Sequence, residues 1–183
     1  MDKKNSHIPN IPASSVPRVV IAGAGFAGLK LVRKLIGKGF QIILIDKNNF
    51  HQFQPLLYQV ATAGLEPSAI SFPLRKVLQN EQDVHFRIAE IKSVDSTNNE
   101  IETSLGRIRY DYLVLAMGAC TNFFSRQELA DNVLSMKSAS DAIMIRNTIL
   151  EHFEQALLKS KPEEIEQYLN IVLVGGGPTG VEL

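Results

Sequence analysis

The stretch RVVIAGAGFAGLKLVRKLIGKGFQIILID, residues 18–46, decides the fold of this chain. Its first five residues, RVVIA, form an apolar run that is typical of a buried parallel strand. GAGFAG follows at once, and the apolar residues after it recur at helical spacing between lysines and arginines. The stretch closes on a second apolar run, QIILID, that ends in an acid. The order of strand, glycine loop, helix and strand predicts a β–α–β unit of an α/β fold.

The glycine loop has the spacing Gly23-x-Gly25-x-x-Gly28, which in this context is typical of a dinucleotide-binding turn. Gly23 permits the tight turn, Gly25 lets the backbone approach a pyrophosphate, and Gly28 lets the helix pack closely on the strand. The start of the helix supplies free N–H groups for phosphate. Asp46, at the end of the second strand, is placed to accept hydrogen bonds from ribose hydroxyls.

A second loop of the same kind, Gly175-x-Gly177-x-x-Gly180, follows the apolar run Ile171–Val174. We expect this run to be the first strand of a second nucleotide-binding domain. Two such loops indicate two dinucleotides, and a flavin with a nicotinamide is a pair between which hydride passes. The alternative is a single-site NAD-binding protein, which the second loop disfavours.

Composition and charge exclude other classes. Lys and Arg number 19 and Asp and Glu number 19, so there is no basic excess for binding nucleic acid. The single cysteine, Cys120, leaves no redox-active dithiol within the chain and is expected to be a small buried residue. No run reaches the roughly 20 apolar residues of a membrane-spanning helix, and the N-terminus has no apolar signal core. We therefore expect a cytoplasmic location, and no metal site.

Further elements follow from periodicity and turn residues. Residues 55–63 and the residues after Pro73 are expected to form short helices, and residues 139–158 a longer one with an apolar face. An acidic helix is expected from Pro162. The predicted strands are Val84–Asp95, which enters a small meander with turns at Asn98 and Gly106, and Tyr112–Met117.

Several parts of the chain together resemble a known family. They are the two glycine loops and the segments LIDKNNFHQFQPLLYQVATAG (residues 44–64), YDYLVLAMGACTNFF (residues 110–124) and IVLVGGGPTGVEL (residues 171–183). They are similar to the flavoproteins that bind two dinucleotides and, among these, to the type II NADH dehydrogenases, which are non-proton-pumping NADH:quinone oxidoreductases. The resemblance runs from Arg18 to Leu183, and HxFxPLLYQVATA is its most specific part. It implies an enzyme that takes hydride from NADH onto non-covalently bound FAD and passes electrons to a membrane quinone.

The resemblance also implies roles for individual residues. The FAD pyrophosphate would lie against Gly23, Ala24, Gly25, Phe26, Ala27 and Gly28, and the adenosine ribose region against Asp46 and Lys47. Ile91 would present its backbone to the adenine, and Pro55 and Leu56 would approach the isoalloxazine. Ala116, Met117 and Gly118 match the family's Ala-Thr-Gly turn beside the cofactor. The NADH pyrophosphate would lie against Gly175, Gly177, Pro178, Thr179 and Gly180, with Glu182 near the reacting rings as the catalytic residue.

The prolines and polar residues of 1–17 predict a flexible lead. The resemblance implies an incomplete FAD-binding domain at 18–137, a helical connector at 138–169 and the truncated start of an NADH-binding domain at 170–183. The chain is thus expected to be a fragment of a parent that contacts the inner face of a membrane peripherally through its missing part. A homodimer is compatible with this interpretation.

One residue departs from the family, and two questions stay open at this point. Met117 stands where the family has threonine, so one polar contact near the cofactor is lost. The chain by itself is expected to be an inert nucleotide-binding fragment, and a related flavoprotein reductase with a protein acceptor is the alternative for the parent. His51 either contacts the cofactor or is a loop histidine that bonds to backbone.

Overall fold

The computed structural model describes residues 10–183 and divides into two compact units. Unit 1 comprises the described residues up to His51 together with Phe72–Ala119, and unit 2 comprises Gln52–Ser71 and Cys120–Leu183. The chain passes between them through β3 (Phe50–Gln52) and β4 (Ser71–Pro73), which form a two-stranded sheet.

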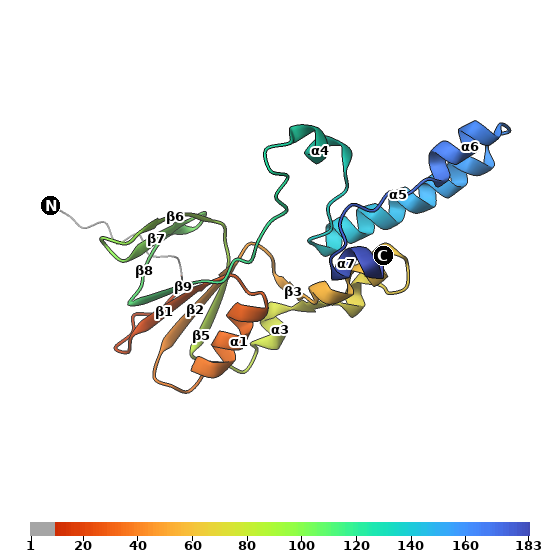
Figure 1. Cartoon of the computed structure of the whole chain (residues 1–183). Coiled ribbons are helices and arrows are strands. Elements are labelled where there is room, and N and C mark those ends of the chain that lie inside the picture. The colour runs from red at the N-terminus through yellow and green to blue at the C-terminus, as the bar shows by residue number, and fades with distance from the viewer. Residues whose placement is uncertain (1–9) are drawn as a thin grey trace. The chain divides into compact units, whose positions relative to one another are not determined.

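Unit 1 is built on a four-stranded parallel sheet with the order β5-β2-β1-β9 (Figure 1). The strands are β1 (Arg18–Ala22), β2 (Gln41–Asp46), β5 (Val84–Ile88) and β9 (Tyr112–Leu115). Because β1 lies between β2 and β9, the loop that follows it emerges between their carboxyl ends. This is the edge where ligands bind in open α/β sheets.

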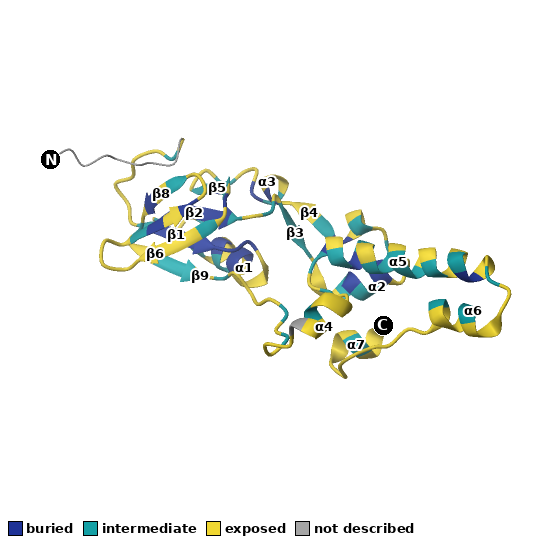
Figure 2. Cartoon of the chain, turned by 90° about the horizontal axis from the view of Figure 1, so that it is seen from above, coloured by how far each residue is buried: buried dark blue, intermediate teal, exposed yellow. Residues whose placement is uncertain are grey.

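Both faces of the sheet are covered, and residues along β1 and β2 alternate between the two cores. Ile21 and Leu44 belong to the core beneath α1 (Phe26–Leu35) and α3 (Leu74–Val77). Val20 and Ile43 belong to a second core, under the antiparallel meander of β6 (Ile91–Asp95), β7 (Glu100–Thr103) and β8 (Gly106–Arg109). All four side chains are 0% exposed, and Figure 2 shows these strands in dark blue. Each contributes roughly 1.5–3 kcal/mol of burial.

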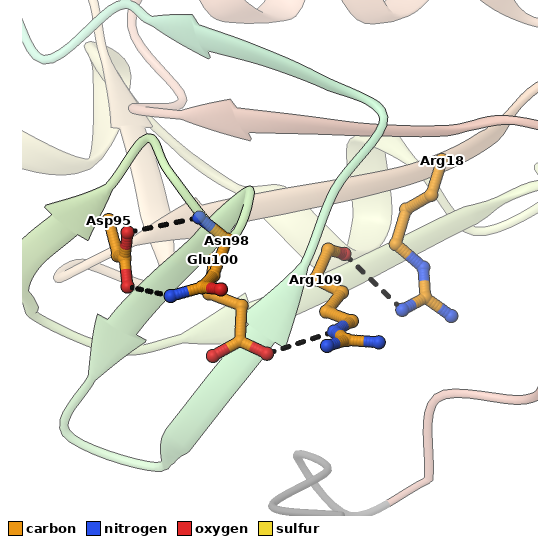
Figure 3. Close-up of polar contacts among 5 residues, drawn as sticks. All are labelled: Arg18, Asp95, Asn98, Glu100 and Arg109. Atoms are coloured by element: carbon orange, nitrogen blue, oxygen red, sulfur yellow. Dashed lines mark hydrogen bonds and ion pairs between the residues drawn. The ribbon is translucent and has the colours of Figure 1, made fainter.

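Polar contacts close the meander and tie it to β1 (Figure 3). The Asn98 side chain donates to Asp95 Oδ2 at 2.7 Å, and this bond lowers the pKa of the Asp95 carboxyl. Arg109 Nε lies 2.9 Å from Glu100 Oε1, an exposed pair that adds little stability. Arg18 Nη1 donates to the Arg109 carbonyl at 3.4 Å. Arg18 therefore connects the first parallel strand to the last strand of the meander.

The N-terminal residues that are described lie against this unit. The buried side chain of Gln41 donates to the Pro12 carbonyl at 2.9 Å, and Ile11 packs on the core under the meander. Residues 1–9 of the predicted lead lie outside the described residues.

Two strand predictions in unit 1 need correction. The expected strand Val84–Asp95 is two strands, because Ala89 and Glu90 lead the chain out of the parallel sheet and into antiparallel pairing with β7. The strand from Tyr112 ends at Leu115 rather than Met117. The Ala116 N–H still donates to the Ala22 carbonyl at 2.7 Å, and the chain then turns at Gly118, where φ is +74°.

Unit 2 is helical and contains the helices predicted at residues 55–63, at 139–158 and from Pro162. Its core joins α2 (Leu57–Ala61) to α5 (Ala139–Leu157), and α6 (Pro162–Leu169) packs along α5. The shorter elements are the 3₁₀ turns η1 (Gln54–Leu56) and η2 (Pro67–Ala69) and the helices α4 (Gln127–Asn132) and α7 (Pro178–Glu182). No helix between residues 10 and 183 is long and apolar enough to cross a membrane.

The expected strand Ile171–Val174 is not formed. Residues 171–177 have no regular secondary structure, and the side chains of Val172 and Val174 are each 82% exposed. An apolar run becomes a strand only when neighbours pair with its N–H and C=O groups, and no strand among residues 10–183 pairs with this one.

Helix α5 begins at a capping box whose removal should be measurable. The Asp141 N–H donates to Ser138 Oγ at 3.2 Å, and the Ser138 N–H donates to Asp141 Oδ2 at 2.9 Å. Ser138→Ala is expected to lower the free energy of unfolding by about 1 kcal/mol. Ser140→Ala, an exposed position in the same turn, should change it by less than about 0.5 kcal/mol. Urea unfolding of both variants checks this, and equal effects would contradict a role for the cap.

His85 on β5 should make stability depend on pH. Burial lowers the pKa of its imidazole below the ordinary 6.5, and the charges of Arg87 and Arg18 lower it further, against a raising effect of Asp83. Below pH 6.5 the unfolded chain therefore takes up a proton before the folded chain does, so stability falls as the pH falls. Denaturant unfolding at pH 8.0 and 5.5 should show a smaller loss for His85→Gln than for the wild type. Equal losses would contradict this assignment.

Candidate dinucleotide-binding site

The first glycine loop leaves no room for side chains at two of its three glycines. Gly23 has a φ of +105°, and a Cβ on it would lie 2.3 Å from the Ala116 carbonyl oxygen. A Cβ on Gly28 would lie 1.8 Å from the Gly23 carbonyl oxygen, well inside van der Waals contact. A Cβ on Gly25 would meet nothing within 4 Å. Gly23 and Gly28 are thus required by packing, whereas Gly25 faces open space.

Asp46 lies beside this loop and holds it. Its Oδ2 accepts a hydrogen bond from the Ala24 N–H at 2.7 Å, and its Oδ1 accepts one from the Asn48 N–H at 2.8 Å. Each carboxylate oxygen can accept a second bond, so the side chain keeps capacity for ribose hydroxyls. Lys47, the next residue, is exposed.

The turn that follows β9 completes this edge of unit 1. Ala116 forms the wall against which Gly23 packs, and Met117 is 62% exposed. The thioether of Met117 therefore points out of the core at the position where the family has threonine. Cys120, which we expected to be buried, is exposed because it belongs to the irregular segment after this turn.

The second glycine loop repeats the local geometry of the first. Gly175 has a φ of +114°, and a Cβ on Gly180 would lie 2.2 Å from the Gly175 carbonyl oxygen. Gly177 caps α7 with φ −73° and ψ 173°, and Gly25 caps α1 with φ −73° and ψ −164°. The loop geometry therefore forms locally, even though the strand expected before it is absent.

The structure groups the predicted site residues in two sets. In unit 1, Gly23–Gly28, Asp46 and Ala116–Gly118 lie at one edge of the sheet, and Ile91 is half-buried at the start of β6. In unit 2, Pro55 and Thr179 line one pocket of about 90 Å³, together with Gln54, Leu57, Tyr58, Met136 and Lys137. Leu56 packs on the core of this unit, and Glu182 is exposed on α7.

Of the two alternatives for His51, the structure shows the contact with backbone. Its Nδ1 lies 3.1 Å from the Ala24 carbonyl oxygen, inside the first glycine loop. Sequence spacing does not reveal this contact, because it joins residues 27 positions apart. Within residues 10–183, no group of three His, Cys, Asp or Glu side chains is placed to hold a metal ion.

The residues at the first loop fit the adenosine diphosphate part of FAD. The loop has three features that a dinucleotide needs: a backbone without a side chain at Gly25, a helix N-terminus with no side-chain cap, and a carboxylate at the end of the next strand. The same glycine geometry recurs at the second loop.

Comparisons with known proteins agree with this geometry. The family model described as "Pyridine nucleotide-disulphide oxidoreductase" matches residues 17–183. The chain is 38% identical over 170 residues to the type II NADH:quinone oxidoreductase Ndh of Mycobacterium tuberculosis, a match that covers 91% of this chain and 37% of that protein. It is 31% identical over 186 residues to the external alternative NADH-ubiquinone oxidoreductase of Yarrowia lipolytica mitochondria, over 94% of this chain and 32% of that protein.

The fold of the chain is also similar to that of a solved structure. The structure of NDH2 from Plasmodium falciparum superposes with a TM-score of 0.84 and 28% identity, over 91% of this chain and 35% of that chain. The present chain thus spans about a third of the length of these relatives. The two glycine loops, the parallel sheet and these matches together show that the chain belongs to the pyridine nucleotide-disulphide oxidoreductase family.

Proposed function

We propose that the complete protein is an FAD-dependent oxidoreductase that takes hydride from NADH and passes electrons to a membrane quinone. The observation that carries this proposal is the presence of two glycine loops with the same backbone geometry in one chain. Two nucleotide sites in one flavoprotein match the chemistry of hydride transfer between nicotinamide and flavin. The names of the relatives from Mycobacterium tuberculosis and Yarrowia lipolytica support NADH as donor and quinone as acceptor.

In this proposal the first loop holds FAD. The N–H groups at the start of α1 bind the pyrophosphate, the backbone at Gly25 approaches it, and Asp46 accepts from the ribose while it also bonds to Ala24. The backbone of Ile91 contacts the adenine, and Ala116–Gly118 lie against the cofactor. When bound, FAD would accept the hydride, that is, two electrons and one proton.

The second loop holds NADH. Gly175–Gly180 bind its pyrophosphate, and Thr179 faces the same pocket as Pro55. Pro55 and Leu56 approach the flavin ring, and Glu182 lies near the reacting rings. The protein's part in catalysis is then orientation: it holds donor and acceptor in one geometry and needs no protein nucleophile.

The proposal includes a peripheral position on the inner face of a membrane, because quinones are membrane-soluble. The contact is assigned to regions that the relatives have beyond the matched third of their length. No nucleic acid takes part, in keeping with a net charge of zero in this chain.

The test uses the purified complete protein. It should carry flavin absorbance that NADH bleaches, and a water-soluble quinone analogue should restore the oxidised spectrum. Flavin that NADH reduces but that only a soluble electron-transfer protein reoxidises would replace the quinone with a protein acceptor. Absence of flavin, or flavin that NADH does not reduce, would refute the proposal.

A further inference from the structure

Two side chains hold the residue at the centre of the first glycine loop from opposite sides. The N–H of Ala24 donates to Asp46 at 2.7 Å, and the carbonyl of Ala24 lies 3.1 Å from His51 Nδ1. A carbonyl can only accept a hydrogen bond, so Nδ1 carries the proton in this contact. The backbone on both sides of Ala24 is therefore fixed by side chains from β2 and β3.

The His51 contact fixes the direction of a neighbouring amide. In a trans peptide the carbonyl of one residue and the N–H of the next point in opposite directions. The bond from His51 to the Ala24 carbonyl therefore also sets the direction of the Gly25 N–H. This amide belongs to the residue that faces open space in the loop.

The imidazole is itself held in place. Its ring meets the ring of Phe26 edge to face, with centroids 5.2 Å apart and an interplanar angle of 86°. His51 is half-buried, and Phe26 is the residue after Gly25. The donor thus has a defined direction toward the loop.

We propose that His51 is a positioning residue that orients the Gly25 N–H toward the pyrophosphate of the bound dinucleotide by holding the Ala24 carbonyl. The proposal rests on the assignment of this loop to FAD. It places His51 one step away from the ligand: the imidazole acts through the loop and not on the flavin ring.

Two substitutions test whether the N–H donor of His51, and not its imidazole ring as such, is required. His51→Leu removes the N–H donor, whereas His51→Asn keeps an N–H donor near the position of Nδ1. Binding of FAD and of ADP to the apo form of the complete protein is then measured for each variant, because ADP has the pyrophosphate but no isoalloxazine. We expect His51→Leu to weaken FAD and ADP equally, by about fivefold, and His51→Asn to stay within about twofold of wild type.

Hydrogen exchange without nucleotide tests the same contact independently of FAD. The amides of Ala24 and Leu29, which donate to Asp46 and to the Gly25 carbonyl, should exchange faster in His51→Leu than in the wild type. A loss for FAD with no loss for ADP would mean that the imidazole acts at the flavin ring. Three results would overturn the proposal. They are this loss for FAD alone, equal losses of nucleotide affinity in His51→Leu and His51→Asn, and unchanged hydrogen exchange in His51→Leu. If the wild type binds neither nucleotide, the FAD assignment fails, and the exchange experiment still decides the role of His51.

Discussion

Replacement of Gly28 by alanine is expected to abolish FAD binding and to destabilise unit 1. The added Cβ would lie 1.8 Å from the Gly23 carbonyl oxygen and 3.4 Å from the Ile21 side chain. The Gly23 backbone cannot move freely, because Gly23 also donates its N–H to the Ile45 carbonyl at 2.7 Å. Overpacking of a buried site costs typically about 1–3 kcal/mol, and here α1 must also move away from β1. We expect a loss of at least about 3 kcal/mol.

Gly25→Ala is the matched control in the same loop. Its Cβ would meet nothing within 4 Å, and Gly25 has a φ of −73°, which alanine adopts without strain. Stability should therefore be unchanged or raised by up to about 1 kcal/mol. FAD affinity should still fall at least about tenfold, because the methyl group occupies the space through which the backbone approaches the pyrophosphate.

Urea unfolding and flavin titration of the complete protein check both variants. A loss of stability in Gly28→Ala would support its role in packing the helix on the strand. Normal stability with weak flavin binding in Gly25→Ala would support the role of Gly25 beside the pyrophosphate. Normal flavin binding in Gly28→Ala would contradict the packing argument, and normal binding in Gly25→Ala would contradict the placement of the pyrophosphate.

The unit 1 fold was largely predictable because its signals are local. The segment Arg18–Asp46 combines two apolar runs, a glycine loop and an amphipathic helix, and each of them dictates its own structure. In unit 2, helix α4 was not predicted, because its six residues, QELADN, show no apolar periodicity. The break between β5 and β6 was missed, although the alternation of Val84, Phe86 and Ile88 loses its phase at Ala89.

Two apolar runs show the limit of local signals. RVVIA at residues 18–22 is a strand, whereas IVLV at residues 171–174 is not. The difference is pairing: β1 has β2 on one side and β9 on the other, and the second run has no paired strand among residues 10–183. An apolar run indicates the capacity for a strand, and its neighbours decide whether the strand forms.

The candidate site likewise has parts that local sequence predicts and parts that it does not. The turn at Gly23 and the close packing at Gly28 were predictable because spacing and conformation lie within six residues, and the role of Gly25 at a pyrophosphate stays a prediction. The contacts of Asp46 and His51 with Ala24 were not predictable, because they depend on the path of β2 and β3 around the loop. These side chains bring together residues 22 and 27 positions apart in the sequence.

In contrast to Gly28→Ala, Gly180→Ala is expected to leave FAD bound and to block its reduction by NADH. The Cβ would lie 2.2 Å from the Gly175 carbonyl oxygen, so the second loop must open while the first is untouched. The rate of flavin bleaching by NADH should fall about 100-fold, which corresponds to about 2.7 kcal/mol. Dithionite should still reduce the flavin fully, because this reductant does not use the nicotinamide site.

Gly176→Ala is the matched control, because its Cβ would meet nothing within 4 Å and its φ lies outside the left-handed region. Stopped-flow reduction by NADH should be near wild type in this variant. Both loops have the same geometry, so Gly28→Ala and Gly180→Ala should each distort their own loop in the same way. Only Gly28→Ala should release FAD. If Gly180→Ala also lost its flavin, the second loop would serve the FAD site, and the assignment of two separate nucleotides to this chain would be wrong.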